Sequence, residues 1–191
     1  MAWVMPVGAP GGINSGFADI EDGSGMVRLG EGILILAPES YQLWRWATTV
    51  PEVDELLALA DQEGFERTQS LVEGLIESGL MIRQAADVRA RMADLSISVV
   101  GDLLGNGSDP RGFFVITGRT GARVDVAIQC FEVLLRSDGT KTVGAICGRM
   151  QDALEAAAPR PILEYVCDAL PVLVRNDIVR LNRPIVDERD G

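Results

Sequence analysis

The stretch LGEGILILAPESYQLWRWATTVPEVDELLALA, residues 29–60, holds the pattern on which the rest of the chain is built. It begins with a Gly-bounded turn that leads into a short apolar strand at residues 33–36. An aromatic helix follows, a threonine pair ends it, and Val53 opens another helix. The stretch therefore predicts a strand that feeds directly into two helices.

The same order recurs at residues 118–150, GRTGARVDVAIQCFEVLLRSDGTKTVGAICGRM. A Gly-bounded turn leads to a strand at 123–126, and the helix that follows has Phe131 in the place of Leu43. A threonine turn then precedes Val143, which opens a helix as Val53 does. Two earlier strand segments, joined by a loop of small and polar residues, precede each copy.

Each copy continues into a third helix and a short terminal strand. In the second copy, Asn176 and Asp177 take the place of Ser78 and Gly79 at the end of that helix. Pro171 removes a backbone donor inside the last helix, so we expect that helix to kink or split.

This order of strands and helices resembles the winged-helix pattern. We expect an α+β fold of two tandem winged-helix (β-β-β-α-α-α) repeats, at residues 1–88 and 94–187, with a linker at 89–93.

Composition narrows the class of function. The chain has 191 residues, is 47% hydrophobic and carries a net charge of −11. No apolar run approaches the ~20 residues of a membrane span, and the N-terminus lacks the pattern of a signal peptide. We expect a globular cytoplasmic protein. The negative charge disfavours binding to nucleic acid and to anionic membranes.

The chain has no histidine, which removes the commonest general base. Cys130, Cys147 and Cys167 lack CxxC spacing and fall at apolar helical positions, so we expect buried thiols. No cofactor loop is present, and we predict no catalytic residues, no metal and no cofactor. The sequence favours a binding protein over an enzyme, although an accessory subunit of an enzyme complex stays open.

A winged-helix transcription regulator is the alternative from another class. In the first copy, however, the helix that would enter a DNA groove carries Glu66, Glu73 and Glu77 against Arg67. A reading helix normally supplies hydrogen-bond donors to bases and phosphates. The sequence therefore favours a peptide or protein partner over DNA.

More narrowly, CFEVLLRSDGTKTVGAICGRM resembles the centre of the PqqD-like family, the peptide-recognition domains of ribosomal-peptide modification pathways. The match lies at Asp138-Gly139, at Thr142-Val143 and, in the first copy, at the Gly79-Leu80 return. LGEGILILAPES is similar to the hairpin of tandem winged-helix segments found in front of thiazole/oxazole-forming enzymes. The resemblance implies that an extended leader peptide adds as a strand beside the third strand of one copy.

The same resemblance implies that apolar side chains of the peptide pack against the third helix. In the first copy the implied site comprises Ile33, Leu34, Ile35, Leu36, Leu71 and Leu75. In the second copy it comprises residues 123–126 with Ile162, Tyr165 and Val166. An ordinary core role, with each edge covered by the other copy, is the competing interpretation.

We favour the first copy because its third helix has no proline. Its strand is apolar on both sides, which predicts that both sides are covered. On the preceding helix, Trp44 is expected in the core, and Trp46 either faces a partner or packs at the boundary. The partner's identity and the oligomeric state stay open.

Overall fold

The computed structural model describes residues 2–13, 21–105, 114–118, 121–153 and 160–185. The chain divides into two compact units, residues 1–85 and 86–191. Helices and small antiparallel sheets make up both units, so the expected α+β class is confirmed. No helix in the described ranges is long and apolar enough to cross a membrane.

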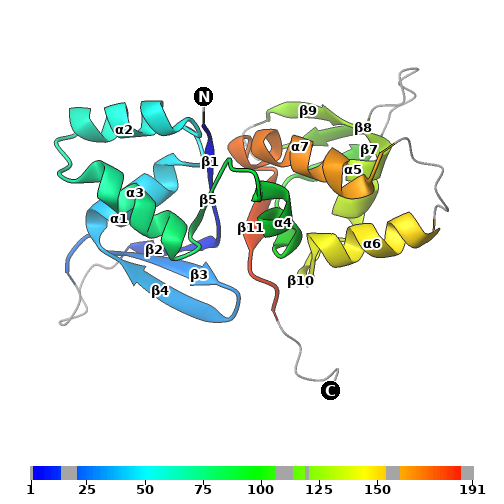
Figure 1. The fold of residues 1–191 in the computed structure, drawn as a ribbon, viewed down its shortest axis with the longest axis horizontal. Helices are drawn as coiled ribbons and strands as arrows, with labels where there is room; N and C mark the ends of the chain where they lie inside the picture. The colour runs from blue at the N-terminus through cyan, green and yellow to red at the C-terminus, as the bar shows by residue number, and fades with distance from the viewer. Residues whose placement is uncertain (1, 14–20, 106–113, 119–120, 154–159, 186–191) are drawn as a thin grey trace. The chain divides into compact units, whose positions relative to one another are not determined.

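The first unit contains strands on both sides of its helices along the chain (Figure 1). Its elements are β1 (Val4–Pro6), β2 (Ala9–Ile13), β3 (Gly25–Leu29), β4 (Gly32–Leu36), α1 (Pro38–Trp46), α2 (Val53–Gln62), α3 (Thr68–Glu77) and β5 (Met81–Arg83). β1 pairs with β5, and β2, β3 and β4 form a separate three-stranded sheet in that order. The closing strand therefore returns to the first strand of the unit.

The second unit follows a similar order. Its elements are α4 (Val88–Ala93), β6 (Ser96–Val99), β7 (Asp102–Gly105), β8 (Phe114–Thr117), β9 (Arg123–Val126), α5 (Ile128–Leu135), β10 (Asp138–Thr142), α6 (Val143–Ala153), α7 (Ile162–Arg175) and β11 (Val179–Asn182). β6 pairs with β11 as β1 pairs with β5, and β7, β8 and β9 form the second three-stranded sheet. β10 adds to the other side of β6.

The ends of α3 and α7 show how closely the two units correspond. Gly79 has φ +76° and Asp177 has φ +49°, the left-handed conformation that ends many helices. The following amide then bonds back into the helix in both units. Leu80 N–H donates to Leu75 O at 2.9 Å, and Ile178 N–H donates to Leu173 O at 2.9 Å. Asp177 therefore stands where the first unit has Gly79, as the sequence predicts.

The packing of α1 on the sheet depends on a glycine. The ring of Tyr41 in α1 covers Gly25 in β3, where a Cβ atom would lie 1.9 Å from the ring. Trp44 is buried beside it and its Nε1–H donates to Val7 O at 3.0 Å, which confirms the core position expected for this side chain. The hairpin, α1 and Val7, the residue after β1, thus share one core.

The correspondence between the first helices differs from the sequence alignment by two residues. α1 and α5 both follow an alanine N-cap, Ala37 and Ala127, in extended conformation. Counting from these caps places Phe131 opposite Tyr41 and not opposite Leu43. An aromatic side chain therefore occupies the same turn of both helices.

The structure refines two expectations about the second unit. Residues 89–93, expected as a linker between repeats at 1–88 and 94–187, lie in the helix α4, which packs on α6 and α7. Met92 of α4 is buried there. Of the kink or split expected at Pro171, the split is absent, since α7 is one helix from Ile162 to Arg175.

Candidate functional site

Strand β4 is the most exposed apolar element in the described residues. It lies at the edge of the β2–β3–β4 sheet. Ile33, Leu34 and Ile35 are 65%, 40% and 51% exposed, and Leu36 is half-buried. We expected both sides of this strand to be covered, and that expectation is wrong. The apolar pattern reflects an open edge instead of a buried strand.

The two faces of β4 have different surroundings. Residues directly opposite each other in an antiparallel pair share a face. Leu34 lies opposite Val27, which is buried, so Leu34 is on the side that faces the helices. Ile33 lies opposite the exposed Arg28 and Ile35 opposite the half-buried Met26, so both isoleucines are on the outer side.

Hairpin geometry also decides which backbone groups of β4 are turned outward. A two-residue loop, Gly30 and Glu31, joins Leu29 to Gly32. In such a hairpin the residues that flank the loop exchange hydrogen bonds, and the bonded pairs then alternate along the ladder. Gly32, Leu34 and Leu36 therefore bond to β3. The N–H and C=O groups of Ile33 and Ile35 point to the open edge.

The second unit has a different pair of side chains at the corresponding positions. Gly118 N–H donates to Ala122 O at 2.8 Å at the base of the β8–β9 hairpin, so the outward groups of β9 belong to Arg123 and Asp125. Both side chains are exposed. Charged residues on an edge strand oppose pairing with another chain. β4 lacks this protection.

The other residues of the implied site lie on helices. Leu71 and Leu75 belong to α3, which packs against α1, α2 and β5. Leu71 is half-buried, whereas Leu75 is 4% exposed and belongs to the core. Of the helices in this unit, α1 is the one that packs against β3 and β4. The structure therefore does not present Leu75 as an open pocket for a bound strand.

Trp46 lies at the end of α1 and is half-buried. Its ring stacks on Phe65 with centroids 5.3 Å apart and planes inclined by 20°. Phe65 precedes α3, so this stack ties α1 to the start of α3. The contact supports the boundary-packing interpretation of Trp46.

The described residues also line hollows away from β4. One of about 380 Å³ lies between α5 and α6 and is lined by Ile128, Gln129, Glu132, Arg136, Met150 and Ala153. Its two charged side chains, Glu132 and Arg136, form an ion pair with each other. No nucleophile lies beside a base in this hollow, so its lining suits packing more than catalysis.

The three thiols are buried in the second unit, as expected. Burial raises the pKa of Cys130 and of Cys147 to about 12, and raises that of Cys167 to about 11. Because the thiolate is the nucleophile and the metal ligand, burial disfavours the reactive form of these side chains at neutral pH. The described residues contain no group of three or more Cys, Asp or Glu side chains placed to hold a metal ion.

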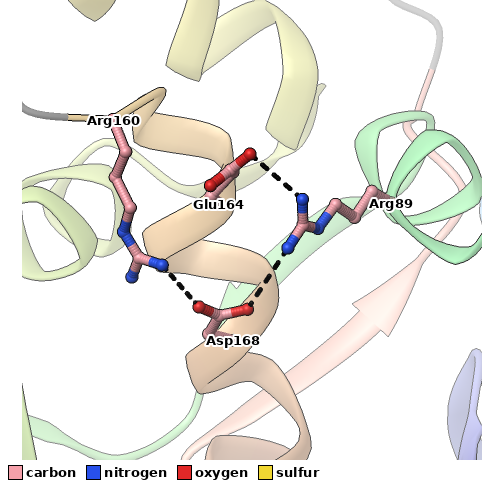
Figure 2. A network of polar contacts seen from close by, with 4 residues as sticks. All are labelled: Arg89, Arg160, Glu164 and Asp168. Atoms are coloured by element: carbon pink, nitrogen blue, oxygen red, sulfur yellow. Dashed lines mark hydrogen bonds and ion pairs between the residues drawn. The ribbon is translucent and has the colours of Figure 1, made fainter.

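A network of ion pairs joins α4 to α7 within the second unit (Figure 2). Arg89 donates to Glu164 at 3.0 Å and lies 3.9 Å from Asp168, which also accepts from Arg160 at 2.7 Å. The guanidinium of Arg160 stands 3.9 Å above the ring of Tyr165. These contacts join α4 to α7 of the same unit and pair both carboxylates, Glu164 and Asp168, with arginines.

Comparison of the chain with protein-family models, with curated proteins and with solved structures finds no significant match.

Proposed function

We propose that this protein is a tandem winged-helix module, similar to PqqD-like domains, that binds an extended peptide or protein segment by adding it as a strand to β4. The observation that carries the proposal is the open edge of β4, where Ile33 and Ile35 present both apolar side chains and backbone groups. Strand addition uses these two features together, because backbone bonds supply affinity and side-chain contacts supply selectivity.

The contrast between the two edges favours β4 over β9. Each unit has a three-stranded sheet that ends in an edge strand before its first helix. Only the first places isoleucines at the outward positions, where the second has Arg123 and Asp125. An added strand would bury the Ile33 and Ile35 side chains on the outer face, at about 25 cal/mol for each Å² removed from water.

The role of α3 changes under this proposal. Leu75 belongs to the core of the first unit, so its truncation tests folding more than binding. Leu71 is half-buried and is the member of the pair that a partner can reach without opening the core. We therefore assign recognition to β4 and not to α3.

Binding without catalysis is the activity that the chain's chemistry supports. The sequence contains no histidine, and its three thiols are protonated at neutral pH. A role as an accessory subunit, delivering a bound segment to a separate enzyme, is consistent with the same surface.

The proposal is tested by selecting peptides from a random library on the immobilised 191-residue protein, and then measuring the selected peptides on two variants. Ile35→Pro removes an outward N–H and is expected to lower affinity at least tenfold, since about 1 kcal/mol of hydrogen bonding and the isoleucine contact are both lost. Asp125→Pro makes the matching change in β9 and is expected to leave the affinity unchanged.

Both variants are first checked by circular dichroism and thermal unfolding for retained structure. If the selected peptides bind folded Ile35→Pro as tightly as they bind the natural chain, the site is not the edge of β4.

A further inference from the structure

The two ends of β4 are acidic, and this charge specifies the segment that the strand accepts. We infer that the partner segment carries a basic residue on each side of its apolar centre and that it is not a second copy of this chain. The inference rests on the proposed function, because it names the partner of the same strand.

Glu31 supplies the charge at the start of β4. It lies in the hairpin loop directly before Gly32 and is exposed. A strand added antiparallel to β4 would place its C-terminal flank near this carboxylate, and a parallel strand its N-terminal flank.

Three carboxylates stand near the other end of β4. The turn that contains Glu21 and Asp22 is closed by Ser24 N–H donating to Glu21 O at 3.0 Å. A Cβ atom on Gly23 would lie 3.6 Å from Pro38, the first residue of α1, so this turn lies against the chain just after β4. Glu39, in the first turn of α1, adds the third carboxylate.

Two arginines belong to the same region, and neither covers these ends. Arg28 is on β3 opposite Ile33, so an added strand would run about 10 Å from it, two strand spacings away. Arg45 is in the last turn of α1, with its guanidinium 5.9 Å from the ring centre of Tyr41. Lysine or arginine on both sides of a bound segment would therefore meet carboxylates at both ends.

Strand length sets the spacing of the two basic positions. β4 has five residues, Gly32–Leu36, and a strand rises about 3.3 Å per residue. An apolar centre of about five residues between the basic positions would span the strand from Glu31 to the acidic turn.

A second copy of this chain is disfavoured by the same charges. In an antiparallel pair of β4 strands, Ile33 of one chain would lie opposite Ile35 of the other. Glu31 of each chain would then lie near the acidic end of the other copy's β4, where Glu39 begins the first turn of α1. Like charges at such positions are destabilising, and each chain also carries a net charge of −11.

The test uses three fluorescent synthetic peptides with the same alternating Val-Thr-Val-Thr-Val centre. Two lysines, two serines or two glutamates flank the centre on each side, and fluorescence anisotropy reports binding to the 191-residue protein. We expect the lysine peptide to bind about fivefold tighter than the serine peptide, as two exposed ion pairs allow, and the glutamate peptide to bind least. The differences should shrink in 1 M salt.

Variants then separate this inference from the proposed function. Glu31→Gln should reduce the preference for lysine about twofold without changing the affinity for the serine peptide, whereas Glu55→Gln, at an exposed position of α2, should change neither. Equal binding of the lysine and serine peptides, with both lost in folded Ile35→Pro, would overturn the charge inference and leave strand addition standing.

Three other results would overturn the inference. Lysine-peptide binding that survives Ile35→Pro would be charge attraction away from β4. Absence of binding by all three peptides would overturn strand addition and the charge inference together. Sedimentation that shows a dimer of the natural chain, lost in Ile33→Lys, would identify a second copy as the occupant.

Discussion

At the scale of single residues, the thiols report how tightly the second unit is packed. Cys130, Cys147 and Cys167 have pKa values raised to about 12, 12 and 11 by burial, so each folded-state thiol stays protonated at pH 8. We predict that iodoacetamide labels none of them in the folded protein within a time that labels all three in urea, as measured by mass spectrometry.

Rapid labelling of one cysteine in the absence of urea would contradict this prediction. It would show that the helix carrying that cysteine opens readily.

Asp177 offers a second test at this scale. It adopts φ +49°, which costs an L-residue free energy that glycine avoids, and its carboxylate makes only a partly exposed ion pair with Arg180. Asp177→Gly is predicted to raise the free energy of unfolding by about 0.5 kcal/mol in urea titrations. The control Asp177→Ala keeps the unfavourable φ and loses the ion pair, so it should be less stable than the natural chain.

If the glycine and alanine variants were equally destabilised, the backbone at Asp177 would not be left-handed. The correspondence with Gly79 would then fail.

Residue patterns of this kind were predictable from sequence because they are local. The helix end at Asn176-Asp177 follows from its likeness to Ser78-Gly79, and the buried Trp44 follows from helical periodicity. The exposure of Ile33 and Ile35 did not follow, because an apolar strand has the same composition whether it is covered by the fold or open at an edge. Only the order of strands in the sheet separates these two cases.

At the scale of elements, proline scanning of β4 tests which backbone groups face outward. Leu34 donates its N–H to β3, whereas Ile35 does not. Leu34→Pro is therefore predicted to lower the free energy of unfolding by about 3 kcal/mol, and Ile35→Pro by about 1 kcal/mol or less. Urea unfolding of both variants measures the difference.

Equal destabilisation by the two prolines would mean that the hairpin register is wrong. A larger effect at Ile35 than at Leu34 would mean that the register is shifted by one residue.

One strand and one alignment could not be predicted from the sequence. The threonine turn before Val143 contains β10, because residues there pair with β6 in an interaction distant along the chain. The sequence alignment placed Phe131 opposite Leu43, two residues from its true counterpart Tyr41. Few residues are identical between the copies, and the alanine caps that fix the alignment have no distinctive side chain.

At the scale of the whole molecule, α4 is the first element of the second unit, so its contacts decide to which unit these residues belong. Arg89 joins α4 to Glu164 and Asp168 of α7, whereas the side chain of Arg91 makes no ion pair with the described residues. Arg89→Ala should lower the unfolding free energy of the second unit by about 0.5–1 kcal/mol, and Arg91→Ala by less. In 1 M salt the two variants should converge, since exposed ion pairs are screened.

Equal effects of the two substitutions at low salt would show that the ion pairs do not hold α4. The sequence placed the joint near the correct residues, because residues 84–94 differ in pattern from the repeats. It assigned part of α4 to a linker because the ion pairs and the burial of Met92 involve helices far along the chain.

Amide hydrogen exchange at β4, followed by NMR in the 191-residue protein with and without the lysine-flanked peptide, tests strand addition most directly. In the free protein, the Leu34 amide should exchange slowly and the Ile33 and Ile35 amides quickly. With the peptide bound, the Ile33 and Ile35 amides should become protected while Leu34 changes little. Peptide binding that leaves the exchange of Ile33 and Ile35 unchanged would contradict strand addition at β4.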